Sequence, residues 1–183
     1  MGWLLLIGGV ALWWGAHLFK RLAPERRAAM GEPGKGLVAL LLAVSVVMMV
    51  FGYRWAEGPV LWGRAAWSVG INNLAMLVAV FLFVASNTGG WVQNRMRHPQ
   101  LIAFKIWAIS HLLVNGELKA IVLFGGLLAW SVVQLILINR SQDWSPQPAG
   151  SLVRDAGAAP VTVALCAVIT WVHVRAGLAP FAA

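Results

Sequence analysis

Six blocks of almost continuous apolar residues run along the chain, and short polar segments separate them. Within each block the apolar residues are contiguous and do not alternate with polar ones, which favours helices surrounded by hydrocarbon. The pattern therefore predicts an all-α polytopic membrane protein, a bundle of about six transmembrane helices in a single transmembrane domain over residues 1–183. The predicted helices lie near 3–19, 37–51, 71–85, 99–114, 117–138 and 159–175.

Composition strengthens the membrane prediction. Hydrophobic residues make up 60% of the 183 residues, whereas charged residues make up only 11%. A chain of this kind exposes far more apolar surface than its few charges can keep in water, and a lipid bilayer solvates that surface.

The positive charge is distributed unevenly between the two sides of the predicted bundle. The formal net charge is +8, with fourteen Lys and Arg residues. Ten of them lie in or beside the first, third and fifth loops: Lys20, Arg21, Arg26, Arg27, Lys35, Arg95, Arg97, Lys105, Arg140 and Arg154. Basic loops stay in the cytoplasm, so both termini are predicted to be periplasmic. This distribution indicates contact with anionic membrane lipid and not with nucleic acid.

The candidate chemistry rests on four histidines, which are His17, His98, His111 and His173. His111 follows Pro99 by about 18 Å at the usual helical rise, and an ionisable side chain at such depth is a functional-site hypothesis by default. The chain has only six acidic residues and one cysteine, Cys166. Neutral imidazole nitrogens therefore suit a haem iron better than a hard cation or a thiolate site.

The fourth predicted helix carries most of this chemistry. Arg97-His98-Pro99 indicates its start, because proline suits the first turn of a helix. His111 and Asn115 share one face with Ala108, whose small side chain leaves room for a flat group beside His111. Asn115-Gly116 favours a left-handed residue that ends the helix, so capping competes with a binding role for Asn115.

The other two helices with histidines allow structural explanations as well. His17 lies near the predicted cytoplasmic edge, where a histidine can extend to the headgroups or bind a ligand. On the last predicted helix His173 continues a polar stripe formed by Thr162, Cys166 and Thr170. Hydrogen bonding within the bundle is the common explanation of such a stripe.

Four short motifs resemble one bacterial family. They are Gly15-Ala16-His17, Lys35-Gly36-Leu37, Arg97-His98-Pro99 and the stretch from Lys105 through Trp107, His111 and Asn115 to Leu118. Together they are similar to the NnrU family of inner-membrane proteins, from the first helix to about Arg140. The resemblance implies a bacterial inner (plasma) membrane location. It also implies a redox or haem-dependent factor linked to nitrogen-oxide metabolism, the reduction of nitrite and nitric oxide in denitrification.

The same family is related to plant 15-cis-ζ-carotene isomerases, which bind haem b. Their ligand histidines match His17 and His111, so the resemblance implies haem b with these two as axial ligands. Arg97 and His98 would then hold propionates, and Asn115 would lie beside the cofactor. The plant enzymes have a cysteine three residues before the second histidine, where it is proposed as an alternate iron ligand. This chain has Ala108 at that position, so the resemblance does not extend to an exchange of iron ligands.

Depth in the membrane suggests other ligand pairs. By helical rise His17 lies about 5 Å and His111 about 18 Å from the cytoplasmic edge. Judged by depth, His17 pairs with His98, and His111 pairs with His173. His98 and His173 are therefore the alternative iron ligands.

Two further functions stay open. A haem-dependent cis-trans isomerase of a polyene or carotenoid would take an apolar, lipid-like substrate from the membrane. A membrane methyltransferase that uses S-adenosylmethionine is the second, because Arg97-His98-Pro99 resembles the cofactor motif of isoprenylcysteine-type enzymes. The residues that follow, Gln100 to Ala103, lack the tyrosine and glycine of that motif.

Overall fold

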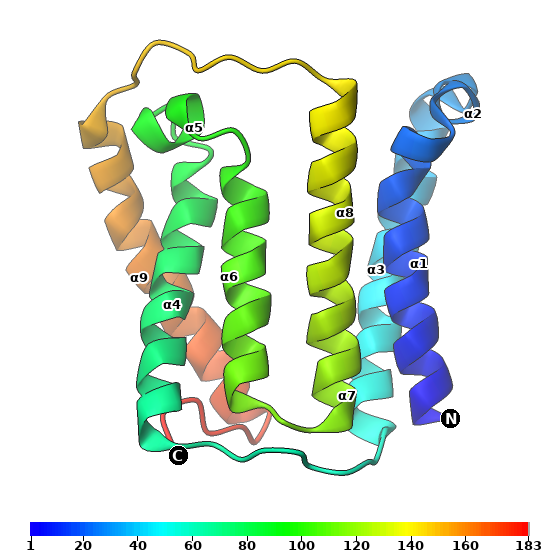
Figure 1. Ribbon diagram of the computed structural model, residues 1–183, viewed down its shortest axis with the longest axis vertical. Coiled ribbons are helices and arrows are strands. Elements are labelled where there is room, and N and C mark those ends of the chain that lie inside the picture. The colour runs from blue at the N-terminus through cyan, green and yellow to red at the C-terminus, as the bar shows by residue number, and fades with distance from the viewer. Residues whose placement is uncertain (183) are drawn as a thin grey trace. The chain divides into compact units, whose positions relative to one another are not determined.

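The computed structural model describes residues 1–182, and Ala183, the last residue of the predicted domain, lies outside them (Figure 1). In chain order the helices are α1 (Gly2–Leu22), α2 (Pro24–Ala29), α3 (Gly31–Trp55), α4 (Ala66–Ala85), α5 (Trp91–Arg95), α6 (Pro99–Val114), α7 (Leu118–Ala120), the π-helical turn η1 (Ile121–Gly125), α8 (Gly126–Ser141) and α9 (Leu152–Arg175). The predicted all-α fold is confirmed.

Five stretches of the described chain are long and apolar enough to cross a membrane. They are α1, α3, α4, the continuous stretch Leu118–Ser141 formed by α7, η1 and α8, and α9. The sixth apolar helix, α6, is shorter at 16 residues. These helices make the chain a polytopic membrane protein.

Most helices extend beyond the apolar blocks that predicted them. α3 begins at Gly31 instead of near Leu37, with Glu32 in its first turn. α9 begins at Leu152, and the Ser151 side chain caps it by accepting a hydrogen bond from Val153 N at 3.2 Å. The apolar count detects only the part of a helix that lies in hydrocarbon, whereas polar turns continue the helix into the headgroup region.

The chain forms two compact units, and the first comprises residues 1–62 and 116–141. In it α1 packs closely against α3 through small residues. A Cβ on Gly9 would lie 2.9 Å from the carbonyl oxygen of Ser45, and a Cβ on Gly52 would collide with the backbone of Leu6. Small residues allow helix backbones to approach in this way inside a membrane. Leu6 and Ser45 are consequently fully buried.

The helix that starts at Leu118 joins the first unit through polar contacts. The Tyr53 hydroxyl donates to Glu117 Oε2 at 3.1 Å, and Lys119 Nζ lies 3.6 Å from the same carboxylate oxygen. At the next turns the Trp14 indole N–H donates to the Gly126 carbonyl at 3.0 Å. These contacts fix the register of Leu118–Ser141 against α1 and α3.

The second unit comprises residues 63–115 and those from 142 on, and α4 packs against both α6 and α9 in it. At one end of α4 the Asp155 carboxylate of α9 is buried. It accepts hydrogen bonds from Thr88 Oγ1 and from Val92 N, both at 3.1 Å. Asp155, Ala158 and Thr162 are the buried residues of α9. The predicted polar stripe therefore begins on the packed side of this helix.

The connection after α6 differs from the sequence prediction. Asn115 has φ −126° and ψ 88°, and the described residues with positive φ are Gly31, Gly89 and Gly177. The left-handed end predicted at Asn115-Gly116 is therefore wrong. Backbone pairing explains this, because Leu61 N donates to Gly116 O at 2.8 Å and Leu118 N donates to Pro59 O at 3.0 Å. This pairing keeps the connection extended.

Candidate functional site

His17 is held against aromatic rings in the first unit. Its Nδ1 lies 3.1 Å from the Trp13 carbonyl oxygen, one turn earlier in α1. Because a carbonyl only accepts, Nδ1 carries the proton and the lone pair lies on Nε2. The imidazole centroid is 4.2 Å from the Trp13 ring and 4.5 Å from the Trp130 ring of α8. The ring is thus oriented by one hydrogen bond and two tryptophans.

His111 has a similar arrangement in the second unit. Its Nδ1 lies 2.9 Å from the Trp107 carbonyl oxygen, so Nδ1 again carries the proton and the lone pair lies on Nε2. The centroids of the Trp107 and His111 rings are 5.1 Å apart. Asn115 Nδ2 donates to the His111 carbonyl at 2.8 Å, so the side chain of Asn115 caps the end of α6.

A Trp-x-x-x-His pattern therefore supports both histidines. In each case the residue four positions earlier provides the carbonyl that fixes the tautomer and the ring that packs on the imidazole. His173 makes the same hydrogen bond, at 2.7 Å, to Ile169, which has no ring. The four-residue spacing between tryptophan and histidine is visible in the sequence. It becomes a contact only because residues four apart lie one above the other on a helix, and the sequence analysis, which treated each histidine by itself, missed this pairing.

The other predicted residues belong to the second unit with His111. His98 is the N-cap of α6, and the helix start predicted at Pro99 is confirmed. Arg97 Nη2 donates to the Gln142 carbonyl at 2.6 Å. His173 also belongs to the second unit, whereas His17 belongs to the first unit.

Comparison with known protein families shows which family the chain belongs to. A family model described as NnrU protein matches residues 5–180. The chain belongs to the NnrU family. No curated protein and no solved structure matches this chain. Membership covers nearly the whole sequence, so the predicted likeness from the first helix to about Arg140 is confirmed and extends through α9.

The donor set of this NnrU-family chain fits a haem. A haem macrocycle supplies four nitrogens, so the protein needs to contribute only one or two axial side chains. A histidine that binds a metal typically donates its other ring N–H to a carbonyl or carboxylate, which orients the imidazole and raises its basicity. His17 and His111 both have this hydrogen bond, and in both the lone pair lies on Nε2. Clusters of three or more His, Cys, Asp or Glu were not found among residues 1–182.

One detail of the predicted site is corrected by packing. Ala108 is fully buried, so the space that its small side chain was expected to leave beside His111 is filled. α6 packs closely on α4 in this unit, which favours a small residue at contact positions.

Proposed function

We propose that this NnrU-family membrane protein binds haem b, with His111 and His17 as axial ligands. The observation that carries the proposal is the shared Trp-x-x-x-His arrangement, in which one tryptophan provides both the carbonyl for Nδ1 and a ring beside the imidazole. A neutral imidazole fixed in this tautomer can bind iron through Nε2. When bound, the haem would supply redox or Lewis-acid chemistry, and the protein would supply orientation and an apolar surrounding.

Arg97 has a more limited role in this proposal than the sequence suggested. It lies fourteen residues before His111, about 20 Å away by helical rise, which exceeds the reach of a propionate from an iron at His111. Its Nη2 donates to Gln142 O, and its Nε is buried without a hydrogen-bond partner in the described structure.

The biological role that we propose is a haem-dependent factor of nitrogen-oxide metabolism in the bacterial inner membrane. Family membership over residues 5–180 supports this role. The basic residues between the apolar helices support an orientation with both termini in the periplasm. The polyene isomerase and the methyltransferase stay predictions, and the titration described below tests the methyltransferase.

Absorption spectroscopy tests the haem proposal directly. The protein is purified in mild detergent, incubated with hemin, and measured oxidised and dithionite-reduced. His111→Ala and His17→Ala are compared with His173→Ala, which removes a histidine that makes the same backbone hydrogen bond. We expect a Soret band in the wild type, a weakened or shifted band in the first two variants, and an unchanged band in His173→Ala.

Each other outcome changes the conclusion. A band lost in His111→Ala and His173→Ala but kept in His17→Ala would replace the ligand assignment with His111 and His173, the pair predicted from depth. A wild type without any Soret band after hemin addition refutes haem binding. Calorimetric titration with S-adenosylmethionine, comparing wild type with Arg97→Ala, would then test the methyltransferase prediction.

A further inference from the structure

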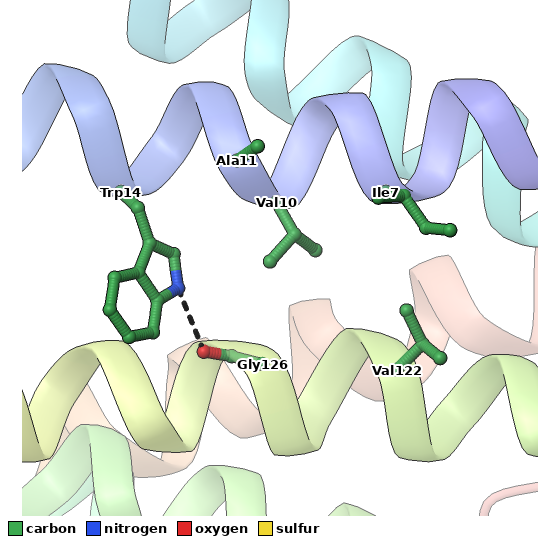
Figure 2. Close-up of a pocket in the computed structure, with 6 residues that line it drawn as sticks. All are labelled: Ile7, Val10, Ala11, Trp14, Val122 and Gly126. Carbon is green, nitrogen blue, oxygen red and sulfur yellow. Dashed lines mark hydrogen bonds between the residues drawn. The ribbon is translucent and has the colours of Figure 1, made fainter.

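Three contacts fix how α1 lies against α8 in the first unit. The Trp14 indole N–H donates to the Gly126 carbonyl at 3.0 Å (Figure 2). A Cβ on Gly126 would lie 2.9 Å from Val10 Cγ1, so the two helices are in close contact at this level. About one turn further along both helices, the rings of His17 and Trp130 lie 4.5 Å apart. The two helices therefore run in the same direction, in a register that these contacts define.

The same register brings two polar residues to one level beyond His17. On α1, Arg21 follows His17 by four residues and shares its face, and on α8, Gln134 follows Trp130 by four residues. Residues four apart on a helix are separated by about 6 Å along the axis. Because His17 contacts Trp130, the next turn of each helix places Arg21 and Gln134 about one turn beyond the imidazole.

Both side chains have hydrogen-bonding groups that the protein leaves unused. Gln134 Oε1 is buried and has no hydrogen-bond partner among residues 1–182. The Arg21 side chain is half-buried, and its guanidinium makes neither a hydrogen bond nor an ion pair within the same range. Buried polar groups in native structures are nearly always paired, because an unpaired one costs free energy. A ligand that pairs with both groups would remove this cost.

The position of Arg21 at a helix end does not account for its burial. A basic side chain in the last turn of a helix interacts favourably with the negative end of the helix dipole, and α1 has two of them, Lys20 and Arg21. Lys20 is exposed, as expected for a solvated charge, whereas Arg21 is half-buried on the face of His17. Its guanidinium presents N–H donors in a planar fork that matches the two oxygens of a carboxylate. A carboxylate is therefore the partner that suits this position.

We infer that Arg21 and Gln134 bind a propionate of the haem that His17 holds, an inference that rests on the proposed function. Arg21 is about 6 Å from His17 by helical rise, whereas Arg97 is about 20 Å from His111 by the same measure. The guanidinium would donate two hydrogen bonds to the carboxylate. Rotation of the Gln134 carboxamide by about 180° would place its N–H donors where Oε1 now lies, so that it donates to the same group.

Titration with hemin and with hemin dimethyl ester tests the assignment, because the ester keeps the iron and the macrocycle but has no charged carboxylate. Dissociation constants are measured in uncharged detergent from the Soret band and from quenching of tryptophan fluorescence. We expect Arg21→Gln to weaken hemin binding about ten- to a hundredfold and Gln134→Met about tenfold, with ester binding unchanged in both. Lys20→Gln is the matched control, because it removes the same charge from the exposed neighbouring position and should change neither constant.

Three results would overturn the inference: unchanged hemin affinity in Arg21→Gln, an equal loss for hemin and its ester, or an equal loss in Lys20→Gln. Haem-free Arg21→Gln should unfold at the wild-type temperature, because the guanidinium has no partner to lose. Arg21→Lys, which keeps the charge without the fork, is the second variant, and its hemin affinity should be intermediate. A wild type that binds neither compound refutes the haem proposal itself. Binding that depends on His17 but not on Arg21 refutes only the propionate site.

Discussion

Replacing Asp155 should loosen the end of the second unit where α4, α5 and α9 meet. The carboxylate is only 6% exposed and accepts hydrogen bonds from Thr88 Oγ1 and Val92 N, each at 3.1 Å. Val92 is the second residue of α5, whose first N–H groups have no partner inside the helix. Asp155 therefore caps α5 from a distant segment of the chain. A Cβ on Gly90 would collide with this carboxylate, which shows how tightly the backbone surrounds it.

The expected cost follows from these two hydrogen bonds. A hydrogen bond to a charged group contributes about 1.5–3 kcal/mol net. Asp155→Ala removes both and leaves Val92 N buried without an acceptor, so we expect a loss of about 3–6 kcal/mol. Asp155→Asn keeps one acceptor oxygen, and its loss should be about 1.5–3 kcal/mol. At about 2–4 °C per kcal/mol, the asparagine variant should unfold roughly 3–12 °C below wild type.

Thermal unfolding in detergent measures the total effect, and hydrogen exchange at the Val92 amide localises it. Asp143→Asn is the control, because Asp143 is exposed and should change stability by less than about 0.5 kcal/mol. A double-mutant cycle with Thr88→Val should give a coupling of about 0.5–3 kcal/mol with Asp155→Asn. If Asp155→Ala unfolds at the same temperature as the Asp143→Asn control, the capping argument is refuted.

Three further predictions concern packing and topology. Gly52→Ala should lower the unfolding temperature, because its Cβ would collide with the Leu6 backbone, whereas Gly36→Ala, with open space around it, should be neutral or stabilise α3 by about 0.5–1 kcal/mol. Tyr53→Phe and Glu117→Ala should each cost about 1.5–3 kcal/mol by thermal unfolding, and the double variant should cost less than their sum because both remove the same hydrogen bond. Alkaline phosphatase fused to the C-terminus should be active, whereas a fluorescent C-terminal green fluorescent protein fusion would contradict periplasmic termini.

The apolar pattern was sufficient to predict the long apolar helices, because a chain in lipid must satisfy its backbone hydrogen bonds within each helix. It could not locate their ends. The first turns of α3 contain Glu32 and Lys35, which form an ion pair at 2.7 Å and count as polar in any hydropathy pattern. The extended connection at Asn115 was also beyond reach, since its cause is pairing with residues 59–61, more than fifty positions earlier in the chain.

The candidate site could be predicted only in part. The sequence names His17 and His111 through a family resemblance, and the tryptophans four residues earlier were visible beside them. Trp130, which contacts the His17 ring from α8, was not, because the contact joins segments more than one hundred residues apart. The burial of Ala108 likewise depends on tertiary packing, which no pattern along α6 reveals.

The choice between ligand pairs depends on what distinguishes one imidazole from another. A neutral histidine inside a helix satisfies its N–H most readily with the carbonyl one turn earlier, and His173 does so without a tryptophan there. That hydrogen bond is therefore no argument for His17 and His111 over His173. The argument is the ring of Trp13 or Trp107, which restricts the imidazole to one orientation. An imidazole that is already oriented loses less entropy when its Nε2 binds iron. If orientation selects the ligands, the Soret band should depend on His17 and His111. If depth in the membrane selects them, it should depend on His111 and His173.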